Sequence, residues 1–218
     1  MSVYFFRQIP DYHMDGFCAV RNTYDNFMNI LKISEIVNTC RDCLVEEEEG
    51  FDIAIFTGDF KRVVVRKDDG YFSMSIPFQI ITSEDYISFV CNLIQEEVNG
   101  RFISIMRNAV NTHRDNQVSH EDVIFSLIEN FNIEIKDSMM YYDAFVSLIS
   151  EDHGYFRFDD DFAHENGDIH PRYHFDIFYK NSTSLKIGYD RHAKLECLYS
   201  LFDNSKDKKY LIEKSRFR

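Results

Sequence analysis

Three short runs rich in β-branched and aromatic residues follow one another between Phe51 and Phe78. The runs are FDIAIFT, FKRVVVRK and YFSMSIPF, with the turn-forming sequences TGD and KDDG between them. Strands joined by such short turns pair in an antiparallel way, because parallel strands need long crossover connections. This part of the chain is therefore predicted to form a three-strand antiparallel meander rather than a doubly wound parallel sheet.

Helical and strand patterns alternate in blocks around this meander. Apolar residues recur near the helical period in several segments, which are about Asn26 to Glu48, Ser83 to Val98, Phe102 to His113, the stretch after Ser119, and Asp137 or Ser138 to Ser150. The strand period returns in YFRF, RYHFDIFYK and SLKIGYD, and a short helix is expected from about Arg191 to Phe202. The order predicts an α+β fold with antiparallel sheet: an N-terminal three-strand meander, a central helical block and a C-terminal hairpin.

The 218 residues are expected to form a single α+β domain. Within it, composition and pattern define four parts, which are helix plus meander (1–82), helical block (83–150), hairpin plus helix (151–205) and basic tail (206–218). The pattern leaves open whether the two blocks of strands join in one sheet.

The distribution of charge along the chain indicates which partners the protein can bind. The net charge is −13, but the segment from Ser205 to Arg218 has six basic and two acidic residues, which leaves −17 on the preceding 204 residues. An acidic surface repels a nucleic-acid backbone and favours a partner protein with a basic surface. Nucleic acid is therefore expected to bind, if at all, only through the basic C-terminal tail.

The cysteines and the beginning of the chain indicate the cellular compartment of the protein. The five cysteines are odd in number and lie mostly inside apolar patterns, which is typical of free thiols in a reducing compartment. The start MSVYFFRQIPDY has no cationic leader followed by an apolar core, and no apolar run approaches the ~18–20 residues of a membrane span. These features predict a cytoplasmic protein that does not contact membranes.

The densest group of ionisable residues is the segment DDDFAHENGDIHPRYHFD, which ends at Asp176. If a strand begins near Pro171, alternation along it places apolar side chains on one face and polar side chains on the other, about 7 Å apart in steps of two residues. The polar row and the residues that can join it from the preceding loop are His164, His170, Arg172, His174 and Asp176.

Two kinds of site fit this row. Histidines with a nearby carboxylate can hold a divalent metal that activates water, and the candidate ligands are His164, His170, His174 and Asp176. A histidine can instead act as a general base that a carboxylate orients, beside a cation for an anionic substrate, and the candidate catalytic residues are His174, Asp176 and Arg172. A third interpretation is that the row is the solvent face of a half-buried hairpin behind a solvated acidic loop, with no cofactor.

The stretch DIHPRYHFD, from Asp168 to Asp176, resembles a family of uncharacterised bacterial proteins. These proteins carry a His-Pro-x-x-His-like strand near the C-terminal end of a chain of similar size. The resemblance implies a setting among mobile elements, phage-defence or toxin–antitoxin gene sets, and it implies no catalytic residues. The bias of this chain towards Ile, Asn, Phe, Tyr and Lys is typical of the A+T-rich genes found in such elements.

Two functions follow as hypotheses. The first is an accessory or immunity-type protein-interaction subunit of a bacterial defence, toxin–antitoxin or mobile-element system, which needs no cofactor. It agrees with the absence of a glycine-rich phosphate loop, a Gly-x-Ser-x-Gly elbow and a His-Glu-x-x-His motif from the sequence. The alternative is a metal-dependent hydrolase or nuclease centred on His170, His174 and Asp176. The sequence leaves open whether the protein is an enzyme.

Overall fold

An eight-stranded antiparallel sheet forms the centre of the computed structural model, which describes residues 2–58, 60–83, 86–116, 119–151, 153–167, 169–177 and 187–203. The strand order is β11-β10-β9-β5-β4-β3-β1-β2. The bounds of these strands are β1 (Ser2–Phe6), β2 (Leu44–Val45), β3 (Ile53–Thr57), β4 (Arg62–Lys67), β5 (Gly70–Ser75), β9 (Phe156–Asp160), β10 (Tyr173–Asp176) and β11 (Ile187–Tyr189). The predicted α+β class with antiparallel sheet is confirmed.

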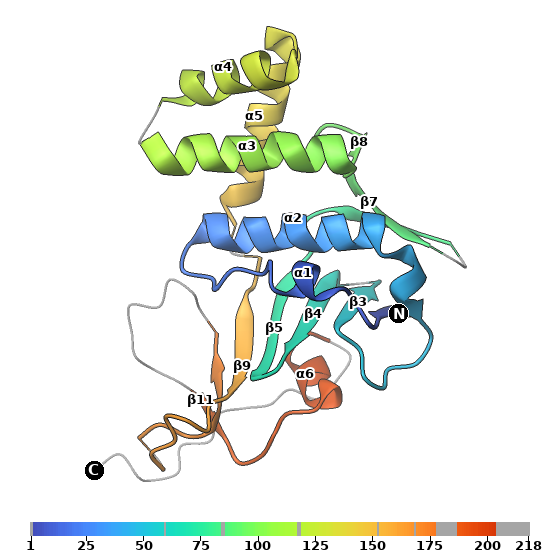
Figure 1. The fold of residues 1–218 in the computed structure, drawn as a ribbon, viewed down its shortest axis with the longest axis vertical. Helices are drawn as coiled ribbons and strands as arrows, with labels where there is room; N and C mark the ends of the chain where they lie inside the picture. Colours follow the sequence, from blue (N-terminus) through green and yellow to red (C-terminus); the bar gives the residue numbers. More distant parts are fainter. Residues whose placement is uncertain are drawn as a thin grey trace.

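Helices cover both faces of this sheet (Figure 1). The helices are α1 (Asp11–Met14), α2 (Thr23–Thr39), α3 (Gly100–Asn116), α4 (His120–Phe131), α5 (Ile135–Ile149) and α6 (Leu195–Phe202), with a 3-10 turn at Arg41–Cys43. In Figure 1, α2 lies across the middle of the molecule, between the sheet and the layer of α3, α4 and α5. Because α2 has neighbours on two sides, it buries nine residues, more than a helix that packs through one narrow apolar stripe.

The central strands are buried on both faces, since α6 packs opposite α2. Along β4, Val63 and Val65 belong to the apolar cluster beneath α2, whereas Val64 packs in the cluster that contains Leu198 of α6. This arrangement explains why the runs of the meander read as almost continuously apolar. The side of the sheet that faces α2 is called the α2 face below.

The two blocks of strands join in one sheet. Strand β5 of the meander pairs with β9, and the register places Gly70 opposite Asp159 and Phe72 opposite Arg157. The connection of the predicted C-terminal hairpin, between the runs RYHFDIFYK and SLKIGYD, and the basic tail lie outside the described residues.

The helix predicted from Ser83 to Val98 is wrong. The stretch instead contributes to a second antiparallel sheet of β6 (Gln79–Thr82), β7 (Ile87–Cys91) and β8 (Glu96–Glu97). Burial along β7 alternates with a period of two, so the apolar residues of ISFVC lie on one face of a strand. The backbone then turns at Gln95, whose φ of 55° lies in the left-handed region.

The other predicted helices differ from the observed ones mainly at their ends. The helix predicted up to Glu48 ends at Thr39 in α2, and the chain continues into β2, which pairs with β1. The sequence analysis did not predict β1. The helices predicted over 102–113 and up to Ser150 are present, and the capping box of Ser119 and Asp122 begins α4 as expected. None of the described helices is both long and apolar enough to span a membrane.

Candidate metal centre

Two neighbouring strands, β9 and β10, carry the polar side chains of the candidate site. Their register places Asp159 directly opposite His174, and Arg157 opposite Asp176. Phe158, which lies between Arg157 and Asp159, packs in the apolar cluster on the α6 side of the sheet. Because side chains alternate along a strand, its two neighbours point to the opposite side. The four polar side chains therefore share the α2 face of the sheet.

The three possible metal ligands lie close together. One oxygen each from Asp159 and Asp176 and one ring nitrogen of His174 lie within 4.8 Å of one another. The guanidinium of Arg157 bridges the two carboxylates, with Nε 2.7 Å from Oδ2 of Asp159 and Nη2 2.5 Å from Oδ2 of Asp176. The site therefore already holds one positive charge between its carboxylates.

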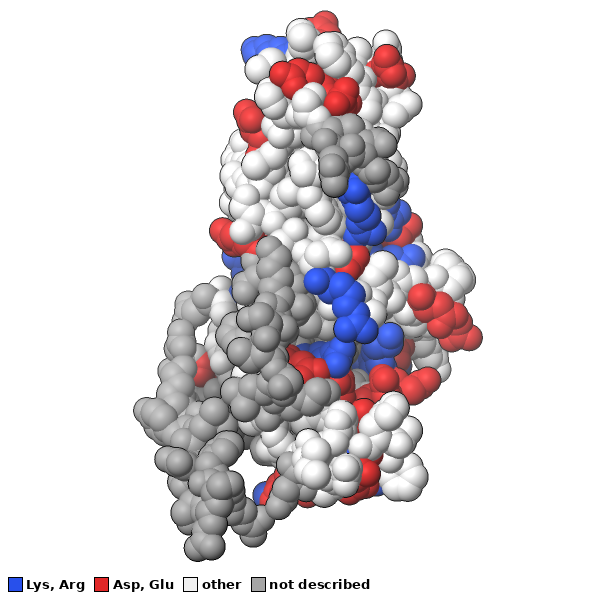
Figure 2. Space-filling view, turned by 90° about the vertical axis from the view of Figure 1, so that its left-hand side faces the viewer, with Lys and Arg blue, Asp and Glu red and all other residues white. Residues whose placement is uncertain are grey.

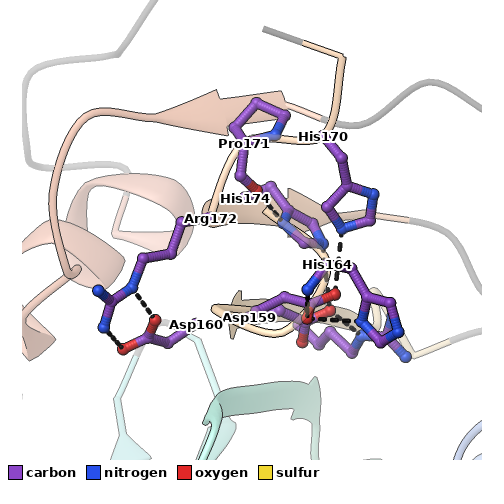
Figure 3. Close-up of polar contacts among 9 residues, drawn as sticks. Asp159, Asp160, His164, His170, Pro171, Arg172 and His174 are labelled. Carbon is purple, nitrogen blue, oxygen red and sulfur yellow. Dashed lines mark hydrogen bonds and ion pairs between the residues drawn. The ribbon is translucent and has the colours of Figure 1, made fainter. Parts of the chain in front are cut away.

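The ring of His174 is oriented for ligation. Its Nδ1 lies 2.9 Å from the carbonyl oxygen of Pro171, and Nε2 lies 3.4 Å from Oδ2 of Asp159 (Figure 3). A carbonyl can only accept, so Nδ1 carries a hydrogen and the lone pair of a neutral ring is on Nε2, on the side of the carboxylate. A hydrogen bond from the second ring nitrogen is the usual support of a metal-binding histidine. The ring is fully buried, so the surrounding structure holds this orientation.

Burial makes an added cation favourable at this site. Desolvation raises the pKa of Asp159, although the positive charge of Arg157 opposes that rise. A carboxylate with a raised pKa in a buried place is stabilised in its charged form by any further positive charge nearby. A divalent cation between Asp159, His174 and Asp176 would supply that charge.

His164 and His170 belong to a different cluster, around Asp161. His164 donates from Nδ1 to Oδ1 of Asp161 at 2.8 Å, and His170 donates from Nε2 to Oδ2 at 3.0 Å. These contacts, chiefly the one from His164, lower the pKa of Asp161 to about 2. The rings of His170 and His174 still meet edge to face, with centroids 5.0 Å apart. The structure thus divides the predicted ligand set into two adjacent groups.

Arg172 does not share the polar row that the sequence predicts. Strand β10 begins at Tyr173, so Arg172 precedes the regular alternation. Its guanidinium binds both oxygens of Asp160, at 2.5 and 3.1 Å, and this contact lowers the pKa of that carboxyl group. Figure 3 shows this pair apart from the histidines. Placing Arg172 with His174 and Asp176 was therefore wrong.

Asp159 and Arg157 were not predicted from the sequence as members of the site. The solvent-face interpretation placed Asp159 in a solvated acidic loop, whereas β9 continues to Asp160. A signal was present, because FRFDD alternates large aromatic and charged residues as a half-buried strand does.

A cavity of about 620 Å³ adjoins the cluster. Arg157 and Asp159 line it, together with the β4–β5 turn around Asp69, the loop between α1 and α2, and the turn from Asp161 to His164. Its volume lies in the range of cavities that hold small molecules. One of the three candidate ligands, Asp159, therefore borders a space that a substrate can enter.

The chain has no match among protein-family models, curated proteins or solved structures.

Proposed function

We propose that the protein is a metal-dependent hydrolase whose divalent cation is bound by Asp159, His174 and Asp176. The observation that carries the proposal is the convergence of three ligand atoms within 4.8 Å, one of them from Asp159 on the wall of a cavity. Three protein ligands leave coordination positions for water and substrate, and a bound cation lowers the pKa of that water. We also place the protein in the cytoplasm, since its five cysteines are free.

Arg157 has two roles in this proposal. Without a cation its guanidinium bridges the two carboxylates and offsets one of their two negative charges. A bound cation takes over that task, and Arg157, which also lines the cavity, becomes available to bind an anionic group of the substrate.

Replacing Asp159 by Asn should abolish Mn²⁺-dependent hydrolysis of bis(p-nitrophenyl) phosphate, with a rate at least ~100-fold lower than wild type. The reason is that a neutral amide is a far poorer ligand, and even partners of metal ligands contribute 10–100-fold to affinity or activity. The matched control is Asp160→Asn, because Asp160 is the next residue but pairs with Arg172 instead. Equal rates in the two variants, or a rate indifferent to Mn²⁺, would contradict the proposal.

A second function is favoured by a different surface. An apolar groove of about 550 Å³ lies between α5 and the turn that joins β7 and β8. Its apolar lining residues are Leu93, Ile94, Ile135, Met139, Met140 and Ala144. The charged residues of its lining are Lys136 and Asp143, and Glu134 and Asp137 are exposed at the start of the same helix. An apolar groove on an acidic protein fits a basic amphipathic helix.

We therefore propose that the groove binds a partner protein with a basic surface. In the setting that the family resemblance implies, this chain would be an accessory or immunity-type subunit of a defence, toxin–antitoxin or mobile-element system. The double change Ile135→Ser and Met139→Ser should weaken binding of a synthetic Leu/Lys amphipathic helix about 10-fold in calorimetry, because both side chains are more than half exposed in the groove. Ile169→Ser, in the loop before β10, is the control. Unchanged affinity in the double variant would exclude this groove.

A further inference from the structure

A band of basic side chains crosses one face of this acidic molecule. Figure 2 shows Lys and Arg side chains gathered down the middle of that face, with acidic side chains at the lower end of the band. We define the cationic band by two pairs of basic residues: Arg114 of α3 and Arg21 of the loop before α2 both contact Asp25, and Arg157 of β9 and Lys67 of β4 line one cavity.

Contacts link the upper part of the band. Arg114, near the end of α3, donates to Oδ1 of Asp25 at 2.7 Å, and the backbone N–H of Arg21 donates to Oδ2 of the same carboxylate at 3.0 Å. Asp25 thus holds the end of α3 and the loop before α2 together. The guanidinium of Arg114 also lies over the ring of Tyr24. These contacts hold Arg114 and Arg21 close together where the end of α3 meets the loop before α2.

The lower part of the band enters the cavity beside the metal centre. Lys67, Tyr155 and Arg157 line the cavity, and so does Ala19, two residues before Arg21. Burial raises the pKa of Tyr155 to about 12, and the positive charges of Arg157 and Arg21 both oppose that rise. The upper and lower parts of the band therefore approach each other at the loop that contains Ala19 and Arg21, and four aspartates line the same cavity, which are Asp69, Asp159, Asp160 and Asp161.

Part of this positive charge is available to a ligand. Within the described part of the chain, the side chains of Arg21 and Lys67 take part in none of the ion pairs, and both residues are exposed. On a protein with a net charge of −13, exposed basic residues gathered in one band are a local exception. Such a band fits the regularly spaced phosphates of a nucleic-acid backbone.

An exposed aromatic ring distinguishes single strands from duplexes. Phe162 lines the cavity and is 71% exposed, and the guanidinium of Arg172 lies 5.1 Å from the centre of its ring. Exposed aromatic rings beside a basic groove bind the bases of single-stranded nucleic acid by stacking, whereas the bases of a duplex are already stacked on one another. A single strand can also place one phosphate inside a cavity that a rigid duplex cannot enter.

We infer that the substrate class is single-stranded nucleic acid, bound along the cationic band with its bases near Phe162 and a phosphate directed into the cavity. Cleavage of the bound strand rests on the proposed hydrolase function, but binding of the strand does not. The cations hold the strand, and the carboxylates at the lower end of the band hold the metal.

Fluorescence anisotropy of a labelled oligothymidylate in EDTA tests the binding without any metal. The double variant Arg21→Gln and Lys67→Gln, which removes the two exposed cations of the band that take part in none of the described ion pairs, should bind at least ~10-fold more weakly than wild type. The slope of log affinity against log salt should fall by about 1.4, because each lost phosphate contact on a single strand contributes about 0.7. Lys136→Gln, which removes one positive charge from α5 outside the band, should bind like wild type.

The outcomes separate this inference from the proposed function. Failure of the wild-type protein to bind the oligonucleotide, equal affinity in the double variant, or preference for the duplex of the same length would each overturn the inference. Binding along the band without Mn²⁺-dependent cleavage would leave the inference standing and contradict the hydrolase. A thermal melt of each variant confirms that the compared proteins are folded.

Discussion

Saturating Mn²⁺ is expected to raise the melting temperature of the wild-type protein by about 5–10 °C. A ligand that binds only the folded state at 100 times its dissociation constant stabilises that state by about 2.7 kcal/mol. For a chain of this size, each kcal/mol shifts the melting temperature by about 2–4 °C. The ligands come from the consecutive strands β9 and β10 and converge only when these strands pair, so the unfolded chain does not offer the same site.

The variants of the site should lose this shift. Asp159→Asn and His174→Ala each remove one of three ligands, so Mn²⁺ should leave their melting temperatures nearly unchanged. Asp160→Asn should keep the full shift, since its side chain pairs with Arg172. Because the comparison is between each variant with and without the cation, any effect of the change on the metal-free fold cancels. A shift that persisted in Asp159→Asn would place the cation elsewhere.

Gly70→Ala is expected to destabilise the protein by about 3 kcal/mol or more. Gly70 has a φ of +142°, and an added Cβ would lie 1.9 Å from the carbonyl oxygen of Phe158. That contact is with backbone, so β5 and β9 would have to separate where Gly70 opposes Asp159. The same change should therefore abolish Mn²⁺ binding in whatever fraction of the protein remains folded. Urea unfolding measures the first effect and calorimetry the second.

Gly100→Ala is the matched control for this change. Gly100 begins α3, and an added Cβ there meets no atom within 4 Å. The variant should therefore match the wild type to within about 0.5 kcal/mol, as surface substitutions do. Equal stability of the two alanine variants would contradict the tight approach of β5 to β9.

Local pattern predicted much of the fold. The three strands of the meander and the helices α3, α4 and α5 have strong periodicity and clear turns or caps. A helix was wrongly predicted for 83–98, because its apolar residues fit the helical period nearly as well as the strand period and Ser83 is a plausible helix cap. In the fold β7 packs against α2, and such a tertiary contact, which local pattern does not reveal, can override local preference.

The candidate site shows the same division between local and distant information. Alternation along one strand correctly put His174 and Asp176 on one face, since that depends only on strand geometry. The opposing residues come from β9, and the sequence does not reveal which residues of two strands pair. For that reason Asp159 and Arg157, which decide the charge of the site, were not predicted.

The most direct test of the metal centre is pulsed electron paramagnetic resonance of Mn²⁺ bound to the full-length protein. We predict a single class of bound Mn²⁺ with a hyperfine coupling to an imidazole nitrogen, because Nε2 of His174 lies on the side of the carboxylates. His174→Gln should remove the coupling, whereas His170→Gln should keep it, since His170 binds Asp161. Bound Mn²⁺ without nitrogen coupling, or coupling that survives in His174→Gln, would contradict the site of Asp159, His174 and Asp176.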